Sequence, residues 1–324
     1  MIDAKFFPHV IDEIFAHASG PALLTLRVNR EWRRRAERKL AYHICVAETV
    51  ADTESLPRKT SVIQSPEGDI LGALKTGSPG ASAPSFLSSA VIVDLHVPKV
   101  DKKVAPILTH CSTEVVLRSH KCCPINATSG FIPRARRVVL FCKDDSLYSD
   151  DDLFGRYRLH RIPGRKHVVL HVRSKGRAEA SHFLDIRDSI GDLDGLTLIL
   201  QPKQSTQYSF EPYSVTDLVV FEIGFLADFV VLAYVRNVPV TVVNLACRRL
   251  DNAHQAAYNY ESVKEALLDR IEFTKRGYTS HPVASVYTPV RFLSLDEYRA
   301  EVGEELFQID TNEGRLWPPH LSYQ

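Results

Sequence analysis

The sequence lacks an excess of charge of either sign, and it lacks a long hydrophobic run. Its 324 residues contain 40 lysines and arginines against 39 aspartates and glutamates, a formal net charge of +1. This balance gives no global field that would steer the chain toward nucleic acid or an anionic membrane. The most apolar run, residues 225–235, is interrupted by Asp228 and falls well below the roughly 20 apolar residues of a membrane-spanning helix. We therefore expect a globular protein with neither a membrane nor a nucleic acid as partner.

Cysteine is also scarce, with six residues at irregular spacing. Such a pattern is typical of reduced thiols rather than of a disulfide framework. The first residues lack the basic stretch and apolar segment of a secretory signal, so we expect no export. These observations together predict a cytoplasmic or nuclear location.

The motifs of common catalytic sites are missing. No glycine-rich phosphate loop and no Gly-x-Ser-x-Gly nucleophile elbow occurs in the sequence, so no cofactor and no catalytic residue is predicted. Zinc ligands are concentrated between residues 110 and 123, but adjacent cysteines point in different directions and no CxxC pair is present. No metal site is predicted from this group, which consists of His110, Cys111, His120, Cys122 and Cys123.

The residues that are present near the start of the chain follow a helical pattern. Pro8 is favoured in the first turn of a helix, because its missing N–H would have no partner there. The segment Ser19-Gly20-Pro21 breaks this helix, and Asn29 is a favourable N-cap for a later one. Three short helices are therefore predicted before residue 42. A unit of about 40 residues buries little apolar area alone and usually needs a partner or a neighbouring domain.

This succession of a proline, paired aliphatic residues, a leucine cluster and Val-x-x-x-Trp-Arg resembles a divergent F-box. The whole chain also resembles, more loosely, a large set of fungal F-box-like proteins. The resemblance implies a non-catalytic adaptor that connects a substrate protein, here unknown, to a cullin-based ubiquitin ligase through a Skp-family adaptor. The positions that match, and that would bind the partner, are Pro8, Val10, Ile11, Ile14, Phe15, Leu23, Leu24, Leu26, Val28 and Trp32.

The alternative is a self-contained interaction or structural protein, in which the same helices form a small cap on the following domain. The arginine-rich segment of residues 29–39 also allows two interpretations, a functional one and a structural one. It could bind phosphates or serve as a nuclear import signal, but its two glutamates and its tryptophan favour a solvated helix face.

The remaining sequence predicts an α/β fold with a mostly parallel sheet. Short β-branched runs read as buried strands and alternate with helical patterns at residues 179–190, 224–236 and 260–275. The spacing of the strands leaves a leucine-rich-repeat-like solenoid as the alternative. The strands are predicted at residues 91–95, 115–117, 138–141, 168–172, 196–200, 218–221 and 240–243.

These patterns divide the chain into four parts. Residues 1–47 form the F-box-like unit, residues 48–89 a linker rich in Ser, Thr, Pro and Gly, residues 90–308 the α/β domain and residues 309–324 a polar tail. Near the end of the α/β domain, Ser294 and Glu297 have the spacing of a capping box that opens a helix, and Gly303 can close it.

Overall fold

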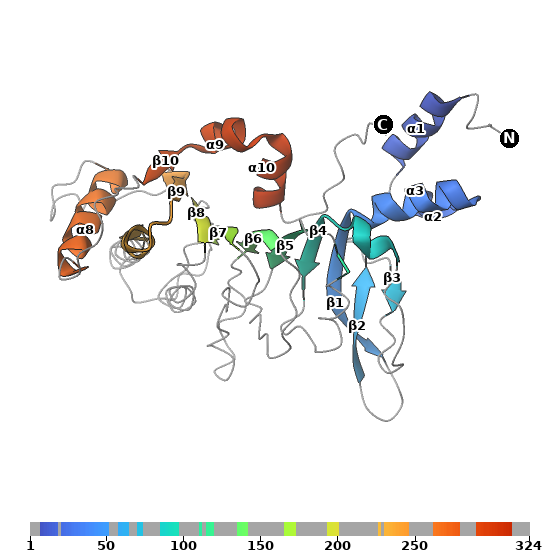
Figure 1. Cartoon of the computed structure of the whole chain (residues 1–324), viewed down its shortest axis with the longest axis horizontal. Coiled ribbons are helices and arrows are strands. Elements are labelled where there is room, and N and C mark those ends of the chain that lie inside the picture. The colour runs from blue at the N-terminus through green and yellow to red at the C-terminus, as the bar shows by residue number, and fades with distance from the viewer. Residues whose placement is uncertain are drawn as a thin grey trace, which may run out of the picture.

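The computed structural model shows an α/β fold built on one large sheet (Figure 1). The sheet has ten strands among the described residues, in the order β10-β9-β8-β7-β6-β5-β4-β1-β2-β3. The structure describes residues 7–18, 21–51, 58–64, 70–73, 85–96, 110–111, 115–119, 135–141, 165–172, 193–200, 226–227, 230–245, 262–278 and 290–312.

Three helices precede the first strand. They are α1 (Pro8–His17), α2 (Pro21–Thr25) and α3 (Arg30–Ala41). The side-chain oxygen of Asn29 accepts a hydrogen bond from the backbone N–H of Trp32 at 2.8 Å, so Asn29 is the N-cap of α3 as predicted. The chain passes from α3 through Tyr42 directly into β1 (His43–Ala51), so the helices are joined to the sheet without a linker.

The part of the chain predicted as a linker contains two strands and a short 3₁₀ helix. β2 (Arg58–Gln64) pairs antiparallel with β1, and β3 (Ile70–Ala73) pairs antiparallel with β2. The 3₁₀ helix η1 (Ser85–Ser89) follows and contributes the buried Leu87. The prediction of an irregular segment at residues 48–89 is therefore wrong where these elements lie. Its many turn residues hid short apolar runs that the sheet buries.

All the remaining pairs of neighbouring strands are parallel. β4 and β5 are buried along their whole length, as expected for strands covered on both faces. The predicted strands were found at six of their seven positions, whereas residues 218–221 lie outside the described part. The six strands are β4 (Ile92–Leu95), β5 (Val115–Ser119), β6 (Ala135–Phe141), β7 (Lys166–Val172), β8 (Leu193–Leu200) and β9 (Val240–Val243).

From β4 to β10 (Arg291–Leu293), the order of the strands in the sheet follows their order in the chain. Right-handed crossovers between successive neighbours all lie on the same face of a sheet. The two crossover segments with helical residues in the described part of the chain agree with this rule. Helical residues 230–235 and helix α8 (Val263–Tyr278) pack into the same apolar cluster. α8 overlaps the helical pattern predicted at residues 260–275 and buries Val263, Leu267 and Ile271 on one face. The predicted helix at residues 179–190 lies outside the described residues.

The opposite face of the sheet is covered by the last two helices (Figure 1). α9 (Leu295–Val302) begins with the predicted capping box and ends at Gly303, whose φ of 82° is the left-handed conformation that favours glycine. α10 (Glu304–Thr311) follows at once and buries Phe307, Ile309 and Asp310. The predicted tail therefore starts too early, because α10 extends past residue 309 and packs on the sheet.

The two faces of the sheet have separate apolar cores, and the N-terminal helices have a third. The first core lies on the side of α8, and the second lies beneath α9 and α10. The third core contains Ile11, Phe15, Leu23, Ala36 and Leu40, all from the N-terminal helices. We call α1, α2 and α3, with the residues between them, the helical unit.

Candidate functional site

The helical unit is held together by side chains of α3 that contact α1. Arg35 pairs with Asp12 at 2.7 Å, and its guanidinium lies 6.0 Å from the centre of the Phe15 ring. Phe15 also meets Trp32 edge to face, with 5.7 Å between the ring centroids. An aromatic pair, an ion pair and a cation–π contact therefore fix α1 on α3.

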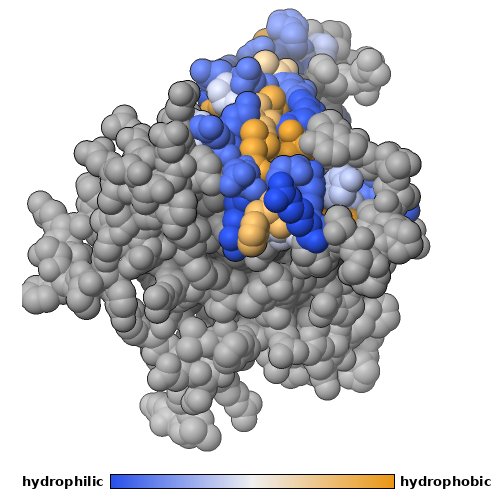
Figure 2. All heavy atoms as spheres, turned by 90° about the vertical axis from the view of Figure 1, so that its left-hand side faces the viewer, coloured by the Kyte–Doolittle hydropathy of each residue, from blue (hydrophilic) through white to orange (hydrophobic). Residues whose placement is uncertain are grey.

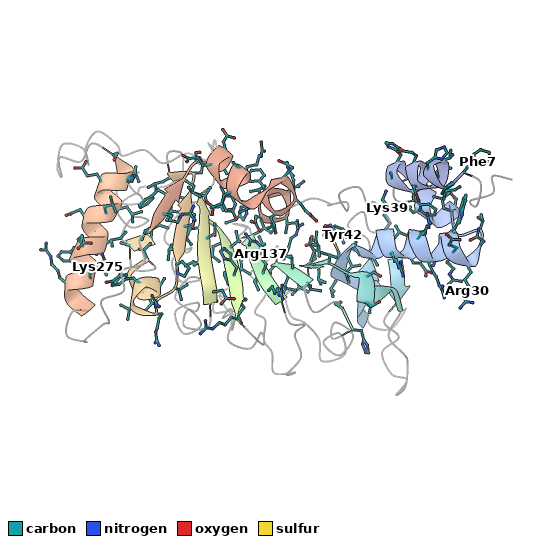
Figure 3. The ribbon with its side chains drawn as sticks, turned by 45° about the horizontal axis from the view of Figure 1, so that its top comes forward. Phe7, Arg30, Lys39, Tyr42, Arg137 and Lys275 are labelled. Carbon is teal, nitrogen blue, oxygen red and sulfur yellow. The ribbon has the colours of Figure 1, made fainter. Side chains whose placement is uncertain are left out.

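Lys39 closes the carboxyl end of α1 from the neighbouring helix. Its ammonium group donates hydrogen bonds to the carbonyl oxygens of Phe15, Ala16 and Ala18 at 2.5, 2.7 and 2.9 Å (Figure 3). The last carbonyls of a helix have no partner within the helix and carry the negative end of its dipole. The buried ammonium group of Lys39 is thus paired with carbonyls at the negative end of the α1 dipole. These hydrogen bonds attach the end of α1 to α3.

A second ion-pair group lies on the outer side of the unit. Arg27 and Arg33 both contact the Glu37 carboxylate, at 2.5 and 2.9 Å. Partial burial would raise the pKa of Glu37, but the hydrogen bonds from the two guanidinium groups outweigh it and lower the pKa below its ordinary value. This group joins the turn after α2 to the middle of α3.

The structure divides the ten predicted partner-binding residues into three sets. Ile11, Phe15 and Leu23 are buried in the core of the helical unit, where they shape the unit from within, and their part in binding a partner stays a prediction. Val10, Ile14, Leu26 and Trp32 are partly buried. Pro8 and Val28 are exposed, and the side chain of Leu24 is outside the described part of the chain.

The exposed apolar residues of the helical unit define a candidate interface. Val28 is 72% exposed and Phe7, which the sequence analysis did not single out, is 50% exposed. We call Phe7, Pro8 and Val28, with the partly buried Val10, Ile14 and Trp32, the apolar surface of the unit. Because other side chains fill the core of the unit, binding a partner at these residues would not require the unit to unfold.

Two other large apolar side chains are exposed among the described residues, both on α8 at the far end of the molecule. Figure 2 looks at this end and shows apolar residues between charged ones. Leu268 is 41% and Phe273 62% exposed, and the guanidinium of Arg270 lies 5.0 Å from the centre of the Phe273 ring. Scattered apolar residues with such cover are normal on a protein surface.

A buried polar cluster occupies the sheet face beneath α10. Arg118 of β5 is fully buried and binds both carboxylate oxygens of its cross-strand neighbour Asp94, at 2.6 and 2.8 Å. The same guanidinium donates to the carbonyl oxygen of Asn312 at 2.7 Å, at the carboxyl end of α10. His171 of β7 contacts the carbonyl oxygen of Asp310. Polar side chains of the sheet thus bind the end of the last helix.

An ion pair also attaches α10 to β6, the strand next to β5. Arg137 of β6 binds both carboxylate oxygens of Asp310 at 2.6 Å, and the Tyr298 hydroxyl donates to Asp310 at 2.5 Å (Figure 3). Although burial would lower the pKa of Arg137, the Asp310 carboxylate raises it above its ordinary value. Burial, followed by the Asp310 charge, also raises the pKa of Tyr298. Both groups therefore hold their protons at any physiological pH.

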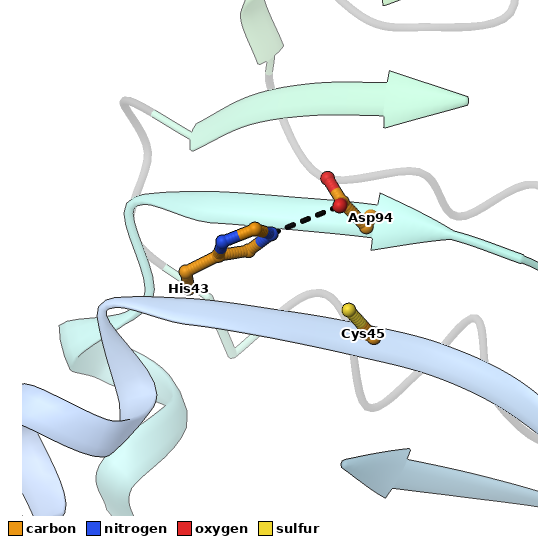
Figure 4. Close-up of side chains that lie close together, drawn as sticks. All are labelled: His43, Cys45 and Asp94. Atoms are coloured by element: carbon orange, nitrogen blue, oxygen red, sulfur yellow. Dashed lines mark ion pairs between the residues drawn. The ribbon is translucent and has the colours of Figure 1, made fainter. Parts of the chain in front are cut away.

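His43, Cys45 and Asp94 bring three potential metal-ligand atoms within 4.8 Å of one another (Figure 4). Asp94 Oδ2 already lies 2.9 Å from His43 Nε2 and 2.8 Å from Arg118 Nη2. A metal ion would compete with a buried guanidinium for that carboxylate, so the arrangement favours an ion-pair group over a metal centre. All three side chains are buried, which also keeps the Cys45 thiol from a substrate.

The group of zinc ligands considered in the sequence is only partly described. Cys111 is buried, and burial raises the pKa of its thiol to about 12. A protonated thiol is a poor ligand, because zinc binds the thiolate. His120, Cys122 and Cys123 lie outside the described residues.

The polar cluster could not be predicted, because its sheet residues stand within or beside apolar runs that indicate ordinary buried strands. The available signal was a charged or imidazole residue inside such runs, at Asp94, Arg118, His167 and His171. Charged residues are rarely buried without a partner, so these positions imply polar partners. The identity of those partners, on neighbouring strands or at the end of α10, depends on the three-dimensional fold.

The fold and the site define a class of α/β protein. Its parallel strands β4 to β10 are ordered as in the chain, α9 and α10 cover the sheet face that carries the buried polar cluster, and a helical unit leads into β1. No model of a protein family, no curated protein and no solved structure matches the chain. Among the described residues, no helix is long and apolar enough to cross a membrane.

Proposed function

We propose that the protein is a non-catalytic substrate adaptor of a cullin-based ubiquitin ligase, and that its helical unit binds a Skp-family adaptor. The observation that supports this most is the exposed apolar surface on a unit that already has its own core. Phe7 and Val28 remain exposed while Ile11 and Phe15 fill the interior, and this interior is separate from the two cores of the sheet. An apolar surface of this kind favours a protein partner.

The proposed adaptor contact thus involves fewer residues than the sequence resemblance alone implies. It consists of the apolar surface, whereas the buried leucine and aromatic residues shape the unit from within. Substituting a buried residue would test the stability of the unit rather than its binding. A charge at Val28 would instead place an unpaired carboxylate in an apolar contact, which costs free energy only when the partner covers it.

In this proposal the mechanism is geometric and the chain supplies no chemical step. The direct passage from α3 through Tyr42 into β1 gives a short connection between the bound ligase and the sheet region. A substrate protein held by the sheet region would then have its lysines at high local concentration near the conjugating enzyme. A cytoplasmic or nuclear location would suit this role.

The experiment is co-expression with a Skp-type adaptor followed by size-exclusion chromatography. The wild-type chain is expected to elute with the adaptor, and Val28→Asp is expected to elute alone. Phe273→Asp is the matched control, because it places the same charge on an exposed apolar residue at the other end of the molecule, and it should leave co-elution intact. Elution of the wild-type chain and both variants without the adaptor would exclude the proposal.

The second candidate is a self-contained interaction protein in which the helical unit caps the sheet. The observation that favours it is the packing of α3 against η1 and β1, which places the unit against the sheet region. Its expected result differs from that of the first candidate, because the Val28→Asp variant would then behave as the wild-type chain in every binding assay.

A further inference from the structure

The arginines of α3 are of two kinds. Arg33 and Arg35 have carboxylate partners within the chain, namely Glu37 for the first and Asp12 for the second. Arg30, Arg34 and Arg38 are exposed, and none of the three has a carboxylate partner in the part of the chain that the structure describes. In the sequence these residues form one basic run, and only the structure separates the arginines with a carboxylate partner from the others.

The three exposed arginines lie in one line. Residues four apart on a helix are neighbours on its surface, and at 1.5 Å rise per residue the three Cα atoms are spaced about 6 Å apart along the axis. The line is on the opposite side of α3 from Ala36 and Leu40, which are buried against α1 and α2. Figure 3 shows Arg30 on the side of α3 that faces away from α1. We call Arg30, Arg34 and Arg38 the arginine line.

The arginine line is unfavourable for the isolated helix. Like charges four residues apart repel one another. Arg30 is also the first residue of α3, where the positive end of the helix dipole disfavours a cation. Only Arg38, in the last turn, is placed well with respect to the dipole. An anionic partner would remove both repulsions at once.

The spacing of the line selects among anionic partners. Carboxylates at i, i+4 and i+8 of another helix repeat with the same rise, so an acidic helix can lie alongside and offer one carboxylate to each guanidinium. A nucleic acid is favoured less, because single strands need exposed aromatic rings for stacking and Trp32 is partly buried against Phe15. The net charge of +1 provides no wider basic field either.

We propose that the arginine line is a docking surface for an acidic helix of a partner protein, with aspartates or glutamates at positions i, i+4 and i+8. This goes beyond the adaptor proposal and does not depend on it. The adaptor contact uses apolar residues around α1 and Val28, whereas the docking surface uses charged residues on the outer side of α3.

The test uses the full-length chain and two synthetic alanine-based peptides, and its readout is fluorescence anisotropy. One peptide carries glutamates at i, i+4 and i+8, and its isomer has the same composition with the glutamates distributed around the helix. The aligned peptide is expected to bind at least about threefold more tightly than the isomer, with an affinity that falls as salt is added.

Arg34→Gln and Arg33→Gln form a matched pair of variants, since the two residues are adjacent and exposed but only Arg33 has a carboxylate partner. Arg34→Gln should weaken binding of the aligned peptide by about threefold, and Arg33→Gln by less than about 1.5-fold. Arg38→Gln is the second variant if the first does not fold. Circular dichroism checks that the helices are retained.

Several results would overturn the proposal. These are the absence of binding by the aligned peptide, equal binding of the two peptides, and equal effects of the Arg33 and Arg34 variants. Tighter binding of a DNA oligonucleotide or of vesicles of an anionic lipid, lost in Arg34→Gln, would assign the line to those ligands instead. Because no Skp-family protein is present in the assay, its failure leaves the adaptor proposal to its own test.

Discussion

The ion pair between Arg137 and Asp310 carries much of the attachment of α10 at the scale of single residues. The side chains are 15% and 0% exposed. Removing one partner of a buried pair leaves the other charge in a medium that cannot solvate it, which typically costs 3–5 kcal/mol. We therefore expect Asp310→Ala to lower the free energy of unfolding by about 3 kcal/mol, as measured by urea denaturation.

Two comparisons make that prediction specific. Glu301→Ala removes an exposed partner of Arg291 and should cost less than about 1 kcal/mol. The double variant Arg137→Met with Asp310→Ala should be less destabilised than the sum of the single variants, because no buried charge is stranded. A loss for Asp310→Ala no larger than that for Glu301→Ala would show that the buried pair has no special weight.

His167 predicts how stability depends on pH. Burial, with Arg137 nearby, lowers its pKa to about 4 from an ordinary 6.5, and its ring lies 2.8 Å from the Thr197 hydroxyl. Gly195 leaves room for the ring, because a Cβ there would lie 2.7 Å from His167 Nδ1. The unfolded chain binds the proton first as the pH falls, so stability is lost between pH 6.5 and pH 4.

We expect this histidine alone to remove about 2 kcal/mol of stability between pH 7 and pH 5. The measurement is urea denaturation of the wild-type chain and of His167→Gln at the two values. Glutamine can keep the hydrogen bond to Thr197 but does not titrate, so its loss over the same interval should be smaller by that amount. An identical loss in both proteins would mean that the histidine does not control the acid response.

At the scale of elements, the cap of α3 has a measurable role. Asn29 supplies the side-chain oxygen for the Trp32 N–H, and α3 carries both the core of the helical unit and the arginine line. Asn29→Ala should destabilise the helical unit by about 1 kcal/mol, whereas Asn29→Asp keeps a capping oxygen and should be nearly neutral. Hydrogen exchange at the amides of α3 measures the difference, and equal exchange in the two variants would argue against the cap.

Elements with a strong local signal could be predicted from the sequence. The Ser294 capping box, the N-cap of α3 and the apolar stripe of α8 depend on residues three to eight positions apart, so the sequence contains all of their determinants. β2 and β3 could not be predicted, since each contains only a short apolar run and lies between turn-forming residues. α10 was not predicted, because its polar residues suggested a tail. One of them, Asp310, is buried and binds Arg137.

At the scale of the whole molecule, the sequence predicted an α/β fold with a mostly parallel sheet but not the order of its strands. Alternation of strands and helices follows from local patterns, whereas the order depends on which distant runs meet. The observed sequential order is the feature that the sheet shares with a solenoid, while α9 and α10 close the second face. The apolar residues of the helical unit could be identified as a group, but only packing separates Ile11 and Phe15 in the core from Val28 at the surface.

We propose above all that a Skp-family adaptor covers the apolar surface of the helical unit. Hydrogen exchange with mass spectrometry on the full chain, with and without the adaptor, tests it most directly. We predict slower exchange at residues 7–18 when the adaptor is present and unchanged exchange along α8, which lies at the far end of the molecule (Figure 1). Unchanged exchange at residues 7–18 under saturating adaptor would contradict the claim.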